Sequence, residues 1–568
     1  MGLKSKIGNP KSQLKSMNQI RVSLEGDTSK NYALNTPVSA LLKRETNESG
    51  IPYIGALVNN NVVSLSYPLD INCRVRFLPA THPLGMRIYR NSLSFLLTKT
   101  VNELFPKVRV CIEHSISAGF FYTIENKDVN VKRLIRKIEE AMQRTVEENL
   151  PIERGKLSYA EALALFEKAK MPEKVGLLRF RNQPKIAVYS CGGFFDLDHG
   201  PLAPNTGVLK RFRLIDYPPG LVLQFPEPQN HKHIPKFKDQ PLLFQIFHEH
   251  KEWGRILGVN NVGRLNELTS RGEIGNFIKI SESFHEKKIA RIADEILARR
   301  KQIRVVLISG PSASGKTTFA KRLAIQMEVN GIRPVTLSMD NYYVDDPKTP
   351  RDKNGRPDYE DINAIDIALF NRHLRDLIRG GEIELTRFDF HRKKRMSTNR
   401  RLRIDPDQII IVEGIHGLNP HFTPMIERRR KFLVYVSALT QLNIDLHNRI
   451  STTDNRLMRR LVRDRNFRGN TPLATLKMWP FVRRGEKRWI FPFQGHADAF
   501  FNSALDYELA VLKPLVEPLL MQVKPTDAEY AEARRLQQFL WNFLGVIRNE
   551  APPNSILREF IGASSFKY

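Results

Sequence analysis

The stretch VVLISGPSASGKTT, residues 305–318, decides the fold of the C-terminal half of the chain. Its first five residues form a short apolar run that is typical of a buried strand, and a helical segment follows Lys316. Between them, Gly310 to Thr317 match GxxxxGK[ST], in which backbone N–H groups surround phosphate oxygens at a helix N-terminus. We expect Lys316 to reach the β- and γ-phosphates and Thr317 to ligate Mg²⁺. The predicted nucleotide-binding residues are Gly310, Pro311, Ser312, Ala313, Ser314, Gly315, Lys316, Thr317 and Thr318.

Further apolar runs follow this loop and alternate with helical segments. They are PVTLSM (334–339), IIIVEG (409–414) and FLVYVSA (432–438). This alternation is typical of βαβ units and a parallel sheet. We therefore predict a doubly wound α/β domain over residues 301–525. A helix over 281–300 is expected to lead into it, and a helix near 527–547 with a tail, within residues 526–568, is expected to close the chain.

Two carboxylates follow predicted strands of this domain. Glu413 ends an apolar strand, where it can hold magnesium or its waters, although a strand-end Glu is often only solvated. Asp340 follows the run 334–339, and ligands of doubly wound sheets bind outside the carboxyl ends of the strands. Asp340 could therefore accept the proton of an attacking hydroxyl, or it could cap an Asp-Asn turn.

An arginine-dense helix is predicted over residues 454–469. Arg456, Arg460 and Arg463 are spaced to share one face of it. Arginines on a mobile helix can close over a triphosphate and neutralise the charge that develops during transfer. A solvated charged face is the alternative interpretation.

The N-terminal half has other patterns. Residues 18–79 alternate apolar and polar positions between turn signals, which predicts a small β-rich domain with one helix near 37–43. Residues 80–245 combine short strands with a helix through Leu93 to Leu104 and a long amphipathic helix from Val131 to Met142, which predicts an α+β domain. Glycine- and proline-rich turns are expected to dominate 191–241. A basic flexible tail (1–17) and a helical connector (246–300) complete the predicted division.

Composition sets the broad class. With 568 residues, 41% hydrophobic and 26% charged, the chain resembles ordinary globular protein of several domains. Its three cysteines form no CxxC pair, which favours a reducing compartment, and we expect the cytoplasm. No apolar stretch reaches the roughly 18 residues that span a bilayer, so no membrane partner is expected. The net charge of +29 indicates affinity for polyanions such as RNA, or phosphate-binding residues on a basic background.

The C-terminal motifs together resemble the uridine kinase branch of the uridine kinase/phosphoribulokinase family. The matching segments are the phosphate loop, DNYY (340–343), FDF (388–390), VEGI (412–415) and DNRLMRRLVRD (454–464) followed by Arg468 and Gly469. The resemblance implies Mg²⁺ and ATP or GTP as donor, with Asp340 as the catalytic base. It implies that Tyr343 and Phe388 face a nucleoside. Lid contacts are implied for Arg456, Arg463 and Arg468.

Two positions depart from the family pattern. Glu360 falls where the family has its ribose-binding Asp, and the base-reading His falls on Lys393 by strict spacing, with His391 close by. The basic stretch 387–403 could instead hold a phosphorylated acceptor. The predicted catalytic residues are Asp340, Lys316 and Arg463, and the predicted metal ligands are Thr317 and Glu413. The predicted acceptor-binding residues are Tyr343, Glu360, Phe388, His391, Arg395, Arg456 and Arg468.

The N-terminal half is similar to the N-terminal region of threonyl-tRNA synthetase. Residues 18–79 resemble its β-grasp (ubiquitin-like) TGS domain, and residues 80–210 resemble its second additional, or editing, domain. The metal or editing positions of that domain fall here on Asn91, Phe95, Asp198 and Leu202. Because Phe95 and Leu202 cannot ligate a metal, the resemblance implies loss of editing chemistry and a role in RNA binding, ligand binding or regulation.

These patterns favour an ATP- or GTP-dependent kinase that phosphorylates the 5′-hydroxyl of a nucleoside. A tRNA- or ribosome-associated NTPase or regulatory protein is one alternative, although no NKxD motif of a GTPase switch follows Lys316. A kinase of a sugar phosphate is another. The expected partners are a small hydroxyl acceptor and RNA or tRNA, and a homo-oligomer is compatible with the sequence.

Overall fold

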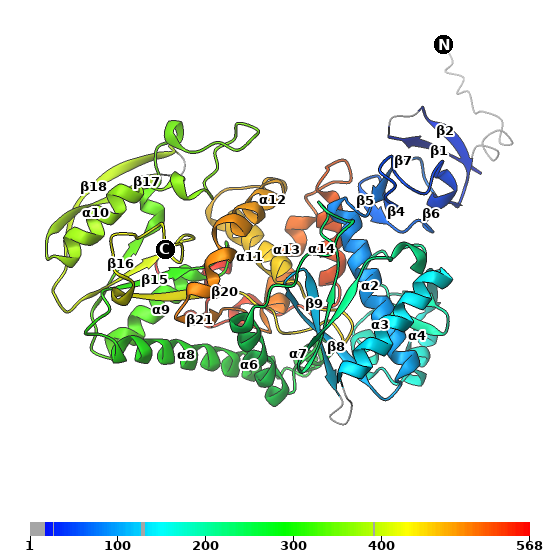
Figure 1. The fold of residues 1–568 in the computed structure, drawn as a ribbon, viewed down its shortest axis with the longest axis horizontal. Coiled ribbons are helices and arrows are strands. Elements are labelled where there is room, and N and C mark those ends of the chain that lie inside the picture. The colour runs from blue at the N-terminus through cyan, green and yellow to red at the C-terminus, as the bar shows by residue number, and fades with distance from the viewer. Residues whose placement is uncertain (1–17, 26–27, 126–130, 390–391) are drawn as a thin grey trace, which may run out of the picture.

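The computed structural model describes residues 18–25, 28–125, 131–389 and 392–568. The predicted basic tail, residues 1–17, lies outside this part of the chain. An N-terminal β-sheet unit lies at one end of the molecule, and the hairpin of the C-terminal α/β region lies at the other (Figure 1). In the described ranges, no helix combines the length and the apolar character needed to cross a bilayer.

The N-terminal unit is a mixed five-stranded sheet in the order β2-β1-β7-β4-β5, with β1 and β7 parallel. Side chains alternate along β1, where Ile20 and Val22 are buried against Val38 and Leu41, so one face of the sheet forms the core. The predicted β-grasp arrangement is confirmed, and its expected helix is a single 3-10 turn, η1 (Val38–Leu41). The strands are β1 (Gln19–Leu24), β2 (Lys30–Ala33), β3 (Thr36–Pro37), β4 (Tyr53–Val58), β5 (Asn61–Val63), β6 (Pro68–Leu69) and β7 (Cys73–Pro79).

The next region is α+β, as predicted. A four-stranded antiparallel sheet, β13-β14-β9-β8, packs against the long helices α2 and α3, and a three-stranded sheet, β10-β11-β12, carries α4 and α5. The elements are α2 (Pro83–Leu104), β8 (Arg109–Ile116), β9 (Gly119–Glu125), α3 (Val131–Glu148), β10 (Glu153–Ser158), α4 (Tyr159–Lys168), α5 (Pro172–Leu178), β11 (Lys185–Cys191), β12 (Phe194–Leu197), β13 (Arg213–Tyr217) and β14 (Gly220–Gln224).

Residues 191–241 contain more regular structure than their glycine and proline content predicts. Strands β12, β13 and β14 all lie in this stretch, which the sequence assigned mainly to turns. Residues Leu221 to Leu223 are buried because β14 is a central strand between β13 and β9. The glycine- and proline-rich turns therefore flank short buried strands, which the sequence pattern did not predict.

Three helices connect this region to the C-terminal sheet: α6 (Pro241–Leu257), α7 (Val262–Ser270) and α8 (Ile274–Ala298). Helix α8 begins earlier than the helix predicted over 281–300, and it packs along α9 of the C-terminal domain. Ile289, Ile292 and Ile296 on α8 are buried in a core shared with the phosphate-loop domain.

The C-terminal domain has a five-stranded parallel sheet in the order β16-β19-β15-β20-β21. This confirms the predicted doubly wound α/β fold. A separate antiparallel hairpin, β17–β18, extends from it (Figure 1). The elements are β15 (Val305–Ser309), α9 (Lys316–Val329), β16 (Pro334–Ser338), α10 (Ile367–Ile378), β17 (Glu382–Asp389), β18 (Lys394–Arg403), β19 (Ile409–Glu413), β20 (Lys431–Ser437), α11 (Thr452–Phe467), α12 (Pro472–Trp489), β21 (Ala499–Asn502), α13 (Glu508–Leu520), α14 (Tyr530–Leu540) and α15 (Arg558–Ile561).

The last long helix is shorter than predicted. The sequence indicates a helix near 527–547, whereas α14 ends at Leu540. The residues that follow bond to other elements: Leu544 N donates to Asn266 Oδ1 and Val546 N donates to Ala510 O. These tertiary hydrogen bonds replace the intrahelical ones, and they hold the C-terminal residues against the domain.

Candidate active site

The phosphate loop connects β15 to α9. At two of its glycines, neighbouring atoms lie so close that no side chain would fit. A Cβ at Gly310 would lie 1.9 Å from the carbonyl oxygen of Val436 on the neighbouring strand. Gly315 has a φ of +81°, and a Cβ there would lie 2.4 Å from Cγ2 of Ile556. Both positions are therefore restricted to glycine, and the loop curls tightly over the first turn of α9.

Lys316 lies at the start of α9 and is folded back over the loop, with Nζ donating to Pro311 O at 3.3 Å. Burial lowers the pKa of Lys316, and the negative charges of Glu413, Glu559 and Asp340 oppose that effect. The predicted phosphate-binding lysine thus lies among carboxylates that only partly offset the effect of burial on its pKa.

Glu413 and Asp340 lie at the carboxyl ends of adjacent parallel strands. Strands β16 and β19 pair so that Ser338 is opposite Glu413, and Asp340 lies in the 3-10 turn η3 (Met339–Tyr342) that follows β16. Ser338 Oγ donates to Glu413 Oε1 at 3.0 Å, and Thr317 Oγ1 donates to Glu413 Oε2 at 3.4 Å. Burial, and next the charge of Asp340, raise the pKa of Glu413 to about 7. The structure thereby brings Lys316, Thr317, Asp340 and Glu413 into one cluster.

Thr317 and Glu413 suit a magnesium ion. Among the residues that the structure describes, no group of three or more His, Cys, Asp or Glu side chains could hold a metal ion. A hydroxyl and a carboxylate in hydrogen-bond contact leave the remaining ligands to water and phosphate oxygens, which is the arrangement that Mg²⁺ prefers. The donor set therefore fits a cation that arrives with a nucleotide, and it does not fit a resident structural metal.

Aromatic side chains gather beside this cluster. The rings of Tyr343 and Phe388 lie 5.5 Å apart, and the rings of Tyr343 and Tyr359 lie 5.6 Å apart. Tyr343 Oη donates to the carbonyl oxygen of Tyr359 at 3.1 Å. The two predicted acceptor-facing aromatics are therefore in contact, and Tyr359 joins them.

Glu360 lies next to these rings with an unsatisfied polar atom. Its Oε2 and the Tyr359 hydroxyl are both buried and make no hydrogen bond within the described part of the chain. Burial, and next the charge of Glu486, raise the pKa of Glu360 to about 7. Helix α12 passes so close that a Cβ at Gly485 would lie 2.3 Å from Cβ of Glu360. Buried polar groups are normally paired, so these two atoms mark a place for a polar ligand.

The predicted lid helix, α11, lies directly on the phosphate loop. Arg456 binds Glu486 with both guanidinium nitrogens, at 2.5 and 2.7 Å, and donates to Ser312 O at 3.3 Å. Arg460 donates to Ser312 Oγ at 2.8 Å. The structure places Arg456 at the phosphate loop. The sequence gave it both as a lid contact and as an acceptor-binding residue.

The other predicted cations differ in how firmly they are held. Arg463 pairs with Asp464 at 3.2 Å, and burial, with Arg468 next, lowers its pKa to about 10. Arg468 is exposed at the end of α11, 3.8 Å from Asp464. Arg395 forms an ion pair with Asp366 at 2.9 Å. His391 lies outside the described residues.

Four residues of the site were missed by sequence reasoning: Tyr359, Arg459, Glu486 and Glu559. Arg459 donates to Ala313 O of the loop at 3.4 Å and pairs with Glu508 at 2.6 Å. Glu486 accepts from Ser312 N at 3.1 Å, and Glu559 accepts from Thr318 N at 3.1 Å. Arg459 was visible within the arginine run, but no local pattern signals that the two glutamates reach the phosphate loop.

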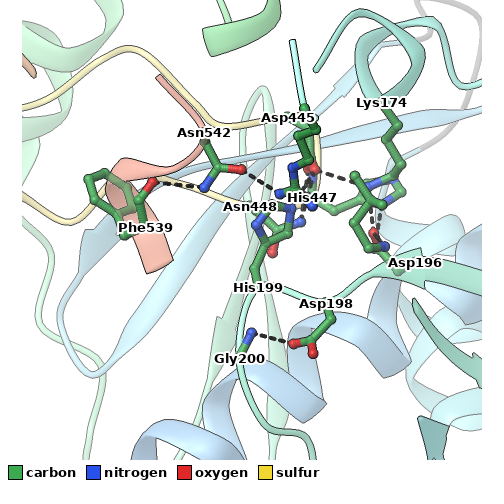
Figure 2. A network of polar contacts seen from close by, with 12 residues as sticks. Lys174, Asp196, Asp198, His199, Gly200, Asp445, His447, Asn448, Phe539 and Asn542 are labelled. Carbon is green, nitrogen blue, oxygen red and sulfur yellow. Dashed lines mark hydrogen bonds and ion pairs between the residues drawn. The ribbon is translucent and has the colours of Figure 1, made fainter. Parts of the chain in front are cut away.

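A second cluster of charges lies in the synthetase-like region (Figure 2). Lys174 Nζ donates to Asp196 Oδ1 at 2.5 Å and to Asp445 Oδ2 at 3.1 Å. His447 contacts Asp196 at 2.8 Å, and His199 contacts Asp445 at 3.2 Å. Asp445 and His447 belong to the loop before α11, so this cluster joins the two halves of the chain.

The positions of the expected editing residues are packed or paired. Phe95 and Leu202 are buried in the apolar core, and Phe95 contacts the ring of Phe194 at 5.2 Å. Asp198 pairs with Arg154 at 2.7 Å and accepts from Gly200 N at 2.8 Å. Phe95 and Leu202 therefore serve packing here, and Asp198 is held by an ion pair and a backbone hydrogen bond.

The N-terminal and C-terminal parts of the chain are similar to different known proteins. Residues 305–510 match the Phosphoribulokinase / Uridine kinase family. The N-terminal part matches threonine–tRNA ligases, and that of Clostridium kluyveri is 32% identical over 163 residues, which cover 28% of this chain and 26% of the ligase. This chain therefore spans about a quarter of the length of that relative.

Two solved structures resemble part of this chain at low similarity. A putative fructose transport system kinase from Silicibacter sp. TM1040 is 18% identical, with a TM-score of 0.29, and the match covers 38% of this chain and 98% of that one. A possible uridine kinase from Bacillus stearothermophilus is 24% identical, with a TM-score of 0.23, and the match covers 26% and 79% of the two chains. Residues 305–510 therefore have the P-loop kinase fold of that family, and the N-terminal part is similar to threonine–tRNA ligases.

Proposed function

We propose that this protein is a Mg²⁺-dependent kinase that transfers the γ-phosphoryl group of ATP or GTP to the 5′-hydroxyl of a nucleoside. The observation that carries the proposal is the position of Asp340. Asp340 lies in the turn η3 directly after β16, and its charge acts on the pKa of Lys316, of Glu413 and of Tyr343, so it is near both the phosphate loop and the aromatic group around Tyr343. An acceptor hydroxyl on the aromatic side would meet the γ-phosphate at this carboxylate.

The transfer step follows from these positions. Asp340 accepts the proton of the acceptor hydroxyl as its oxygen attacks the γ-phosphorus, and the bond to the bridging oxygen of the diphosphate breaks. Lys316 and Arg463 neutralise the charge on the phosphate oxygens during this step. Thr317 and Glu413 would hold the magnesium ion, which supplies further charge neutralisation when bound with the nucleotide.

The side chains around Tyr343 support a nucleoside as the acceptor class. Tyr343, Tyr359 and Phe388 offer aromatic faces on which a base can stack. Glu360 Oε2 and the Tyr359 hydroxyl can pair with ribose hydroxyls, because both atoms are buried without another partner among the described residues. Aromatic surface next to a carboxylate suits a nucleoside.

A phosphorylated acceptor is less well supported. Its phosphate would need an unpaired cationic side chain beside the aromatic group, and the predicted Arg395 is already paired with Asp366. RNA contact is a proposal that rests on the threonine–tRNA ligase match and the net charge of +29. That contact is compatible with kinase activity, since it concerns the N-terminal half.

An acceptor screen tests the proposal. The purified protein is incubated with labelled ATP or GTP, Mg²⁺ and a panel of nucleosides and sugar phosphates, and labelled product is counted. Asp340→Asn is expected to lose about 10²–10⁴-fold in kcat, as removal of a general base does. Asp407→Asn is the matched control, because the Asp407 side chain is 70% exposed on a surface loop. Normal turnover of Asp340→Asn would exclude Asp340 as the base.

A further inference from the structure

Two carboxylates of the chain occupy backbone N–H groups of the phosphate loop. Glu486 Oε1 accepts from Ser312 N at 3.1 Å. Glu559 Oε2 accepts from Thr318 N at 3.1 Å and from Thr318 Oγ1 at 2.7 Å. Loop N–H groups of this kind bind the phosphate oxygens of a nucleotide. At both ends of the loop, carboxylate oxygens therefore stand where phosphate oxygens would bind.

The position of Glu559 is favourable only while no phosphate is bound. Thr318 lies in the first turn of α9, where N–H groups lack intrahelical partners and the helix dipole attracts negative charge. The charge of Glu559 also acts on Lys316 and on Arg463, the two cations assigned to the triphosphate. A nucleotide phosphate on the same N–H group would meet this carboxylate at short range. The two anions therefore exclude each other.

The two carboxylates are anchored differently. Glu486 is fully buried and paired with Arg456 and with Arg483, the latter at 2.9 Å, so its charge is compensated within α11 and α12. Glu559 lies on α15, a helix of four residues near the C-terminal end of the described chain. Leu557, Phe560 and Ile561 on either side of Glu559 are buried in the core. The Glu559 side chain itself is in no ion pair within the described residues, so it can turn away from Thr318 without breaking one.

Other contacts hold this segment over the start of α9. The Tyr568 hydroxyl lies 2.9 Å from Thr318 Oγ1, and Ile556 packs against Gly315. Phe560 lies beneath the guanidinium of Arg459 at 5.1 Å from the ring centroid. Residues 551–568, which we call the C-terminal cap, therefore cover the N-terminus of α9 with both apolar and polar contacts.

We propose that the C-terminal cap is autoinhibitory: Glu559 imitates a nucleotide phosphate, and a nucleoside triphosphate must displace it in order to bind. This inference rests on the proposed nucleotide site. The cap competes with the ligand for Thr318 N, and it neutralises the cations that the ligand needs. Loss of the Glu559 charge should weaken the cap and strengthen nucleotide binding.

The test compares Glu559→Gln with the wild-type protein in titrations with Mg²⁺ and a fluorescent ADP analogue. Glutamine keeps the size of the side chain but removes its charge, and charge-assisted hydrogen bonds are about twice as strong as neutral ones. We expect the Kd to fall about tenfold, equivalent to ~1.4 kcal/mol. Glu550→Gln is the matched control, because Glu550 is exposed in the same C-terminal region and should leave the Kd unchanged.

Hydrogen exchange gives an independent readout of displacement. Addition of Mg²⁺ and ADP to the wild-type protein is expected to increase exchange at the backbone N–H groups of residues 557–562. An unchanged or higher Kd for Glu559→Gln would refute the autoinhibitory role of the C-terminal cap. Slower exchange of these residues after nucleotide is added would refute it as well. If neither the wild type nor Glu559→Gln binds nucleotide, the proposed nucleotide site fails and the cap with it. If both bind equally well, only the cap fails.

Discussion

Two lysines each face carboxylates, the fully buried Lys174 and the half-buried Lys316, but their surroundings differ. Lys174 is completely buried and bonded to Asp196 and Asp445 (Figure 2). Burial alone would lower its pKa, but the two carboxylates outweigh burial and the pKa is raised. At Lys316 the balance is reversed: burial dominates and the pKa is lowered, although three carboxylates lie near.

The carboxylates show the same contrast. The pKa of Asp445 is held well below its usual value, since Lys174 and His199 overcome the effect of burial. The pKa of Glu413 is raised to about 7 by burial and by Asp340. A cluster in which every charge is paired stabilises the contact between two regions, whereas a cluster with uncompensated charge is prepared for a ligand. The Lys174 cluster is accordingly structural, and the Lys316 cluster is the proposed site of chemistry.

The largest expected effect is on catalysis at Lys316. Lys316→Ala removes the cation assigned to the β- and γ-phosphates, and kcat should fall on the order of 10³-fold. The denaturant midpoint should change little, because the hydrogen bond to Pro311 O is the only one that Lys316 makes within the described residues. Turnover is measured by labelled-phosphate transfer, with Lys287→Ala on the exposed face of α8 as control. Unchanged turnover would remove the basis for treating this lysine as functional.

The next effect is on stability at Lys174. Lys174→Met leaves Asp196 and Asp445 buried without their cation, so the free energy of unfolding should fall by about 3–5 kcal/mol. Turnover per folded molecule should stay close to that of the wild type. Urea denaturation measures the loss, and Lys168→Met on the exposed face of α4 is the control. A stable Lys174→Met protein with impaired turnover would reverse the roles assigned to the two lysines.

A smaller effect is expected on the pH dependence at Glu413. With a pKa of about 7, this carboxyl is protonated below that pH and cannot ligate a cation, so the Mg²⁺ concentration for half-maximal activity should rise about tenfold per pH unit below 7. The pKa of Glu413 in the folded state, about 7, lies above the ordinary value of about 4.5, so its contribution to stability falls as the pH rises from about 4.5 to 7.

Glu413→Gln separates these effects from the titration of the nucleotide itself. The variant should need more Mg²⁺ at every pH, and the slope between about pH 6 and 7 should be lost. It should also be more stable than the wild type at about pH 8, because no buried charge remains to be desolvated. A retained slope in the variant would assign the titration to another group, such as Glu360, whose pKa is also about 7.

Local sequence patterns predicted the parts of the site that local structure creates. The phosphate loop and the strand-end positions of Asp340 and Glu413 followed from motif and apolar run, because parallel strands bring their carboxyl ends to one edge. Contacts between distant segments gave no such signal. Lys174 and Asp445 are separated by 271 positions, and Thr318 and Glu559 by 241. Only the packing of the synthetase-like region and the C-terminal cap against the kinase domain brings these pairs together.

The smallest effect is expected at Tyr359, whose hydroxyl is one of the two unsatisfied polar atoms beside the aromatic group around Tyr343. The Tyr359 hydroxyl is buried without a hydrogen-bond partner in the described chain, so Tyr359→Phe removes a group that now has no compensating bond. Stability should therefore stay equal or rise slightly, in contrast to the loss at Lys174. The KM for the nucleoside should rise by a few-fold, since one hydrogen bond is worth about 0.5–1.5 kcal/mol, while the KM for ATP should not change.

Tyr342→Phe provides the comparison that makes this small effect interpretable. The Tyr342 hydroxyl is bonded to His373 Nδ1 at 3.1 Å, so its loss breaks a formed hydrogen bond and should lower stability without changing the KM for the nucleoside. If both variants lost stability and neither changed that KM, the unpaired Tyr359 hydroxyl would be a packing defect and not a ligand contact. If Tyr359→Phe raised the KM without loss of stability, and Tyr342→Phe lowered stability without a change in KM, the unpaired Tyr359 hydroxyl would be a contact to the acceptor.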